Sequence, residues 1–353
     1  MDIPTRKTII EKVRRKGLKI AGILPIHYPR ALLRAFGFHP MELWGPPGIS
    51  QHGENGHFPE YTCAVARNAT AFLTGEGGKI VDCVLVPHTC DSLQGMSSLL
   101  QGYVNTGCPE FTLYNPRETS PAAEIFLAGE IERLFEKLRV FAAVSPTDAD
   151  LHEAIDRENE ADQAFNRLCL NRNRFALSNR EFYTLLRSRE YLPLEDFLAL
   201  VPPEGKAPEG VPIMMSGIVP EPMALFDHLT AHGALVAGDD LACCGRRVYQ
   251  PLYDKNPYLR MAKQLLSKPP DPTAGHDVAE RIDHVVKRME QCSAKGIIVY
   301  NVKFCEPELF FLPLQRKALE ERGWPTLYLE EALPETIPHQ TLTRMEAFLE
   351  VLQ

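Results

Sequence analysis

Three cysteines stand near the ends of expected secondary-structure elements, where their thiols could meet. Cys63 precedes a helix-like run, Cys90 follows the mostly apolar run of residues 80–86, and Cys305 follows the apolar run of residues 296–300. Ligands of open parallel sheets bind beyond the carboxyl ends of the strands. Because thiolates suit soft metals, the three cysteines could converge on one metal site.

The intervals along the chain exclude a local zinc-finger loop. They are 27 residues from Cys63 to Cys90 and 215 residues from Cys90 to Cys305, whereas structural zinc usually takes at least one closely spaced cysteine pair. A shared site must therefore be assembled by the tertiary fold. Three thiolates also leave one coordination position of a cubane or of a tetrahedral metal for a ligand other than cysteine.

The composition is that of an ordinary globular protein. The chain has 353 residues, of which 44% are hydrophobic and 24% charged, and this length predicts two to three domains. The net charge of −8 argues against a nucleic-acid partner. No apolar stretch approaches the roughly 20 residues that span a bilayer, and the N-terminal segment does not have the pattern of a secretory signal. We therefore expect a cytoplasmic protein, away from membranes, whose nine cysteines are free thiols or metal ligands.

Residues 1–120 alternate between strand-like and helix-like runs and should form an N-terminal α/β domain. The expected strands are residues 19–24 and 80–86, and the expected helices are residues 30–37, 67–73 and 92–102. This alternation predicts a parallel sheet with helices on its faces.

The rest of the chain is expected to form a helical region, residues 121–208, and a C-terminal α/β domain, residues 209–353. The helical region should contain helices at 122–143, 149–170 and 179–188 and end in the Pro/Gly-rich linker 202–210; the last domain should contain strands at 211–218, 234–237, 296–300 and 326–329 and helices at 222–232, 276–292, 312–322 and 342–352. The expected fold class is α/β, with two Rossmann-like parallel-sheet domains, a helical region between them and the metal site in the interdomain cleft.

Five short motifs carry a resemblance to a known family. They are Tyr61-Thr62-Cys63-Ala64-Val65-Ala66-Arg67-Asn68, His88-Thr89-Cys90-Asp91-Ser92, Gly238-Asp239-Asp240-Leu241 with Gly245-Arg246, Lys303-Phe304-Cys305-Glu306-Pro307, and Leu342-Thr343-Arg344-Met345-Glu346-Ala347-Phe348. In this order they resemble the cluster-carrying subunits of 2-hydroxyacyl-CoA dehydratases and class I benzoyl-CoA reductases. The resemblance extends from about residue 19 to the end of the sequence.

The resemblance implies that Cys63, Cys90 and Cys305 hold one [4Fe-4S] cluster whose fourth iron has no cysteine ligand. It also implies a paralogous sister subunit or a second copy of this chain, and a separate ATP-hydrolysing iron-sulfur activator that delivers an electron. The substrate would be an acyl-CoA or aryl-CoA thioester, reduced by one electron for loss of a 2-hydroxyl group or for ring reduction. The run Cys90-Asp91-Ser92-Leu93-Gln94 slightly favours the benzoyl-CoA reductases. The chain has no Walker-type phosphate-binding motif, which fits a separate ATPase.

Elementary chemistry agrees with these implications. A thioester carbonyl is hard to reduce, so its site needs a reducing centre, a Lewis-acidic metal at the oxygen, and exclusion of water. A cluster with one iron free of cysteine would supply the first two. Cys63 and Cys90 each precede a helix-like run, and a helix N-terminus favours thiolates and the negative charge of such a cluster.

One branch of this superfamily carries a double cubane and needs further cysteines. The corresponding places here read Ile26-His27-Tyr28 and Lys268-Pro269-Pro270-Asp271, which argues against a double cubane. Cys243 and Cys244 stand where that branch places one ligand. We expect them to pack beside the cleft, with a role at a cluster as the alternative.

Several neighbours of the proposed ligands could take part in chemistry. His88 and Glu306 flank proposed ligands and His27 follows the first strand, so each is a candidate for proton transfer. Asp239, Asp240 and Arg246 could form a capped turn with an ion pair, or they could contact a partner subunit or CoA.

Less specific interpretations remain for the cysteines. Cys83, Cys169 and Cys292 are expected to pack within a strand and two helices, whereas Cys108 lies in a loop and could line the site.

Two alternative functions also stay open. The chain could be a non-catalytic iron-sulfur electron-transfer or scaffold subunit, or a zinc-binding structural protein that uses the same thiols.

Overall fold

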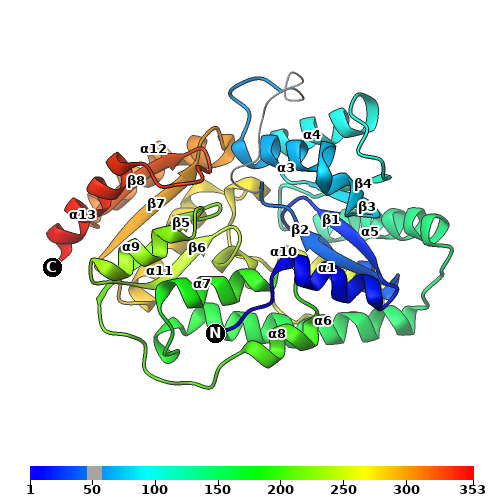
Figure 1. Ribbon diagram of the computed structural model, residues 1–353, viewed down its shortest axis with the longest axis horizontal. Coiled ribbons are helices and arrows are strands. Elements are labelled where there is room, and N and C mark those ends of the chain that lie inside the picture. Colours follow the sequence, from blue (N-terminus) through cyan, green and yellow to red (C-terminus); the bar gives the residue numbers. More distant parts are fainter. Residues whose placement is uncertain (46–57) are drawn as a thin grey trace.

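The computed structural model describes residues 1–45 and 58–353 and contains two four-stranded sheets in which every pairing is parallel (Figure 1). The first sheet has the order β2-β1-β3-β4, with β1 Lys19–Ile23, β2 Phe38–Glu42, β3 Cys83–His88 and β4 Glu110–Tyr114. The second has the order β6-β5-β7-β8, with β5 Val211–Gly217, β6 Ala234–Leu241, β7 Gly296–Val302 and β8 Thr326–Glu331. The predicted α/β class with two parallel sheets is confirmed.

The α-helices connect and cover these strands. Their bounds are α1 Arg6–Arg15, α2 Arg30–Ala35, α3 Ala64–Thr74, α4 Asp91–Gly102, α5 Pro121–Ala142, α6 Asp148–Leu170, α7 Asn179–Ser188, α8 Leu194–Leu200, α9 Ala224–Ala231, α10 Pro257–Leu266, α11 Val278–Gln291, α12 Glu306–Glu321 and α13 His339–Leu352. Among the described residues, no helix is both long and apolar enough to cross a bilayer.

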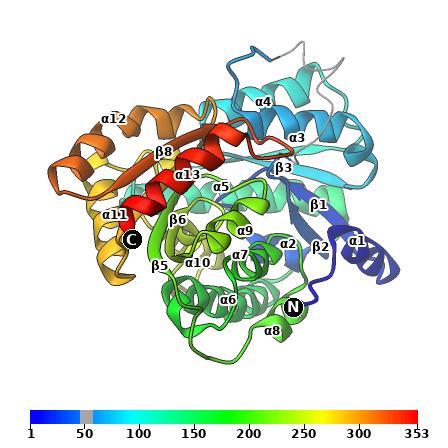
Figure 2. The same cartoon turned by 60° about the vertical axis from the view of Figure 1, so that its left-hand side comes forward.

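Successive side chains of a central strand point to opposite faces of its sheet, and each face packs against a different set of helices. Val84 and Val86 of β3 pack in the core with α3 and α4, whereas Leu85 packs on the opposite face with α5. The second sheet is covered in the same way. Figure 2 shows α13 across the face that it shares with α9, and α11 and α12 pack against Met214 and Val299 on the other face.

Helices α6 and α7 contribute to a core that includes strands of both sheets. Both begin with a capping box, in which Thr147 or Ser178 and an acidic residue three positions later exchange hydrogen bonds with the backbone. On α6 the buried Glu158 accepts hydrogen bonds from Arg34 and Arg189. Burial alone would raise the pKa of Glu158, but these guanidinium groups outweigh it and lower that pKa to about 2.

Five helices and strands were not predicted from the sequence, namely β2, β4, α1, α8 and α10. β2 contains Pro40 and polar residues, but it is an edge strand, where the missing N–H of proline costs least. β4 is the other edge strand, with a half-buried alternation. The amphipathic helices α1 and α10 were also missed; α10 packs against α5 in the core beside the first sheet.

The helix predicted at 312–322 begins earlier than expected. It starts at Glu306, directly after Cys305, and continues through Pro313. Proline usually marks a helix boundary in a sequence because it removes one backbone hydrogen bond. The longer helix is important because its first residue follows a proposed cluster ligand.

Candidate metal centre between the two sheets

Cys63, Cys90 and Cys305 line one pocket with an empty volume of about 440 Å³. The pocket lies where the strands of both sheets end, since residues that follow six of the strands form its wall. These wall residues are Ile26 after β1, Trp44 after β2, Thr89 and Cys90 after β3, Ile218 after β5, Ala242 after β6 and Cys305 after β7. The fold therefore brings together thiols that are 27 and 215 residues apart in the sequence.

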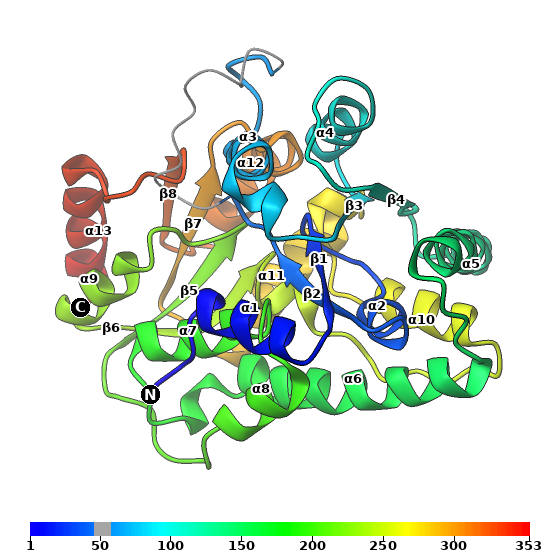
Figure 3. The ribbon, with the colours of Figure 1, turned by 45° about the vertical axis from the view of Figure 1, so that its right-hand side comes forward.

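Each of the three cysteines occupies the N-cap position of a helix. Cys63 precedes α3, Cys90 precedes α4 and Cys305 precedes α12, and Figure 3 shows the three helices gathered on the same side of the molecule. The backbone N–H groups of the first helical turn have no partner within the helix, and the N-terminus carries partial positive charge. Three such ends at one pocket favour an anionic, sulfur-ligated group.

Backbone amides of these first turns already point at two of the sulfurs. The backbone N–H groups of Val65 and Ala66 act to lower the pKa of Cys63, and those of Ser92 and Leu93 act in the same direction on Cys90. Backbone N–H groups near a sulfur stabilise its thiolate and tune a cluster that the thiolate holds.

The ionisation of the three thiols differs. The hydrogen bond with Cys305 lowers the pKa of Cys63, against the effect of burial, and the same contact together with burial raises the pKa of Cys305 well above its usual range. Burial raises the pKa of Cys90 to about 12, although its amide contacts oppose this. Ligation by a metal would require all three to lose their protons.

The three sulfurs are not all in contact with one another, although Cys63 and Cys305 contact each other. The three sulfur atoms do not all lie within 4.8 Å of one another, since the only group of three described His, Cys, Asp or Glu ligand atoms that does so lies elsewhere. A tetrahedral zinc ion with bonds of 2.3 Å would hold its sulfurs about 3.8 Å apart. Among the residues that the structure describes, the pocket wall has no charged side chain. Three thiols at one pocket suit a soft metal centre, either a multinuclear cluster or a zinc ion.

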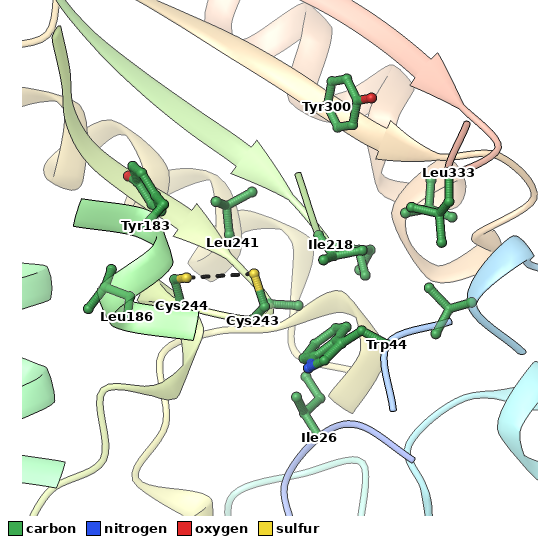
Figure 4. Packing of buried hydrophobic residues seen from close by; sticks show 14 of the residues in the cluster. Ile26, Trp44, Tyr183, Leu186, Ile218, Leu241, Cys243, Cys244, Tyr300 and Leu333 are labelled. Carbon is green, nitrogen blue, oxygen red and sulfur yellow. Dashed lines mark hydrogen bonds between the residues drawn. The ribbon is translucent and has the colours of Figure 1, made fainter. Parts of the chain in front are cut away.

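Trp44 covers one side of the pocket, and a buried ion-pair cluster fixes its position. Figure 4 shows Trp44 beside Ile26 and Ile218. Its indole Nε1 donates a hydrogen bond of 3.1 Å to Glu42. Neither Trp44 nor Glu42 was a sequence candidate, because the strand β2 that precedes Trp44 was itself not predicted.

Glu42 joins the two halves of the molecule. Its side chain is fully buried and accepts hydrogen bonds from Arg30 at 2.5 Å and from Arg247 at 2.7 and 2.9 Å. Burial opposes the ionisation of Glu42, but the two guanidinium groups outweigh it and lower its pKa. Because Arg247 follows β6 of the second sheet, this contact holds the two sheet edges together beside the pocket.

Of the three candidates for proton transfer, only Glu306 is in a pocket that adjoins the cysteines. Glu306 is the first residue of α12 and lines a second pocket with Phe310. This pocket shares Ser92 and Thr273 with the cysteine pocket.

His27 and His88 do not line the cysteine pocket. His27 is buried between Tyr249, at 2.9 Å from Nδ1, and Asp271, at 3.1 Å from Nε2, and burial lowers its pKa to about 4. His88 is the last residue of β3, and its ring packs against Tyr114 of β4 at 4.6 Å between centroids.

Asp240 of β6 and Arg246 belong to a buried ion-pair network, whereas the neighbouring Asp239 accepts hydrogen bonds from the backbone N–H groups of Leu241 and Gly245. Arg246 is completely buried and contacts Asp240 and Asp271 at 3.4 Å, and it also pairs with Glu308 in the first turn of α12. Asp240 is in turn paired with Arg281. Since these side chains are buried, their charges pair with one another, as in the capped-turn interpretation of the sequence, and they support the end of α12 that carries Cys305.

Cys243 and Cys244 lie outside the pocket wall. Both are fully buried, their sulfurs are 3.6 Å apart, and they pack with Tyr183 and Leu186 (Figure 4). This agrees with the expected packing role. Cys108 is also outside the cysteine pocket, where its sulfur contacts Thr106.

Two parallel sheets whose strand ends enclose three cysteines define a class of α/β proteins with a thiol-lined site between the sheets. Comparison with known proteins places the chain more closely. It matches the 2-hydroxyglutaryl-CoA dehydratase, D-component family over residues 25–352, and it belongs to this family.

Several named relatives match along most of their length. The (R)-phenyllactyl-CoA dehydratase beta subunit of Clostridium sporogenes is 23% identical, over 98% of this chain and 95% of the relative. The lactoyl-CoA dehydratase subunit beta of Anaerotignum propionicum is 25% identical with the same coverage. A benzoyl-CoA reductase subunit of Thauera aromatica is 20% identical, over 89% of this chain and 86% of the relative. The resemblance seen in the sequence motifs is confirmed.

Proposed function

We propose that the chain is the cluster-carrying subunit of an activator-dependent enzyme that acts on CoA thioesters, and that Cys63, Cys90 and Cys305 hold one [4Fe-4S] cluster. One observation carries the proposal: three cysteines from distant parts of the sequence cap three helices around one pocket. The relatives are named as subunits of 2-hydroxyacyl-CoA dehydratases and of a benzoyl-CoA reductase, which supplies the class of reaction.

The residues of the pocket fit this cofactor. Within residues 1–45 and 58–353, its wall is apolar apart from the thiols, the indole of Trp44 and the hydroxyl groups of Thr89, Ser92 and Thr273, which favours exclusion of water. A bound cluster would supply a low-potential electron and a Lewis-acidic iron free of cysteine. The helix N-termini of α3, α4 and α12 would stabilise the negative charge of the three thiolates.

Glu306 is the side chain best placed to move a proton in such a reaction. It lines the pocket next to the cysteines, at the N-terminus of α12. Because that pocket shares Ser92 and Thr273 with the cysteine pocket, a thioester entering between α4 and α12 would pass Glu306. We assign no such role to His27 or His88, since neither lines either pocket.

The proposal also includes partners. Since the relatives are named as subunits, we expect a sister subunit or a second copy of this chain, together with a separate ATP-hydrolysing activator. The substrate class is an acyl-CoA or aryl-CoA thioester. All nine cysteines are free thiols in the structure, which suits a reducing compartment such as the cytoplasm.

Electron paramagnetic resonance of the anaerobically reduced protein tests the catalytic part of the proposal. A 2-hydroxyacyl-CoA and benzoyl-CoA are added separately, with free CoA as the control. We expect one thioester to change the cluster spectrum while free CoA does not, and the responding thioester would distinguish dehydration from ring reduction. A cluster spectrum that neither thioester changes would favour the electron-transfer or scaffold alternative.

A further inference from the structure

A second group of possible metal ligands lies outside the cysteine pocket, between α9 and α13. His228 is in the last turn of α9, His232 is its C-cap residue, and Glu346 faces both from α13. Figures 1 and 3 show these two helices side by side. The possible ligand atoms of the three residues all lie within 4.8 Å of one another, and this is the only such group in residues 1–45 and 58–353.

The histidine rings are oriented as metal ligands usually are. Nδ1 of His232 lies 2.9 Å from the carbonyl oxygen of His228, so it must donate its proton there. The ring of His228 lies near the backbone carbonyl of Leu342, and its buried Nε2 has no hydrogen-bond partner. Metal-binding histidines characteristically donate one ring N–H in this way, which fixes the ring and frees the other nitrogen.

The freed nitrogens and the carboxylate have the spacing of one coordination sphere. Oε1 of Glu346 is 3.4 Å from Nε2 of His228 and 3.6 Å from Nε2 of His232. A tetrahedral ion with bonds of about 2.0–2.1 Å separates its ligand atoms by about 3.3 Å. One oxygen between two unprotonated ring nitrogens makes no hydrogen bond to either, so a cation is the partner that would satisfy all three.

We propose that His228, His232 and Glu346 form a binding site for a divalent metal of the zinc type, separate from the cysteine pocket. Two imidazoles and a carboxylate suit Zn²⁺, with water as the fourth ligand. The C-terminal end of α9 adds partial negative charge beside the site. The ion connects α9 to α13, and so fastens the last helix to the face of the second sheet that both helices cover.

Zinc binding by the full-length protein tests this proposal. We compare wild type with His232→Gln and Glu346→Gln. Both residues are more than one third exposed, so these changes should not prevent folding, and circular dichroism checks this. His339→Gln, at the exposed start of the same α13, is the control. All four proteins keep every cysteine, so zinc held by thiols contributes equally to each.

Wild type and His339→Gln should bind one zinc ion per chain that His232→Gln does not bind, or that His232→Gln binds at least about tenfold more weakly. Zinc should also raise the melting temperatures of wild type and His339→Gln more than it raises that of His232→Gln. With Co²⁺, the difference between wild type and His232→Gln should lack the charge-transfer band of a thiolate ligand. Equal zinc binding by all four proteins, equal loss in His339→Gln, or a difference that contains the thiolate band would each overturn the proposal.

Discussion

Replacing Glu42 by glutamine should destabilise the protein strongly, because Glu42 is the shared acceptor of two buried arginines. The carboxylate is completely buried, and Arg30 and Arg247 approach it at 2.5 and 2.7 Å. Glutamine keeps the size of the side chain but removes its charge. Both guanidinium groups then lose their shared counter-charge in a site that is closed to water.

Removing one partner of a buried ion pair costs about 3–5 kcal/mol of the free energy of unfolding. The unfolding entropy of a protein of 353 residues is about 0.7 kcal/mol/K, at about 2.1 cal/mol/K per residue. The melting temperature of Glu42→Gln should therefore fall by about 4–7 °C. Since Arg247 follows β6 of the second sheet and Glu42 ends β2 of the first, the loss should appear in both halves of the molecule.

Urea unfolding followed by circular dichroism measures this loss directly. Glu204→Gln is the matched control, since Glu204 pairs with Arg174 at 3.5 Å with both side chains more than half exposed, and an exposed pair contributes about 0–1 kcal/mol. If Glu42→Gln and Glu204→Gln lost the same small amount of stability, Glu42 would not be the junction that we describe.

Two further substitutions test other parts of the fold. Glu158 has a pKa lowered to about 2 in the folded protein, so its contribution of about 3 kcal/mol is complete above about pH 4.5 and disappears as the pH falls toward 2. The stability difference between wild type and Glu158→Gln should shrink over that range in urea titrations, and a constant difference would contradict the reasoning. In Gly217→Ala the new Cβ would overlap the backbone of Tyr300, and φ of Gly217 is +138°, so we expect a loss above about 3 kcal/mol or failure to fold. Gly95→Ala, where the added carbon meets no atom within 4 Å, should instead leave stability unchanged or raise it slightly, and similar losses in both variants would refute this account of Gly217.

Local patterns in the sequence predicted the central part of the fold. The strands at residues 19–23, 211–217 and 296–302 are apolar runs, and the capped helices α6 and α7 have marked starts. The edge strands β2 and β4 escaped prediction because an edge strand packs on fewer neighbours and tolerates proline and polar residues.

The site was predictable only in part. The thiols of Cys90 and Cys305 follow buried strands, so their meeting at the sheet edges could be anticipated. The contact of Glu42 with Arg247 joins residues 205 positions apart in the sequence, and no local sequence pattern indicates such a pair. The placement of Trp44 over the pocket depends on that contact and was therefore missed.

Counting iron, acid-labile sulfide and zinc in anaerobically purified protein tests the central claim most directly. We predict about four iron and four sulfide per chain in wild type, and much less of both in Cys90→Ser. Cys292→Ser, whose sulfur lies outside the pocket and contacts Met289, should keep the wild-type amounts. Stoichiometric zinc without sulfide, or full iron and sulfide in Cys90→Ser, would contradict a [4Fe-4S] cluster held by these three cysteines.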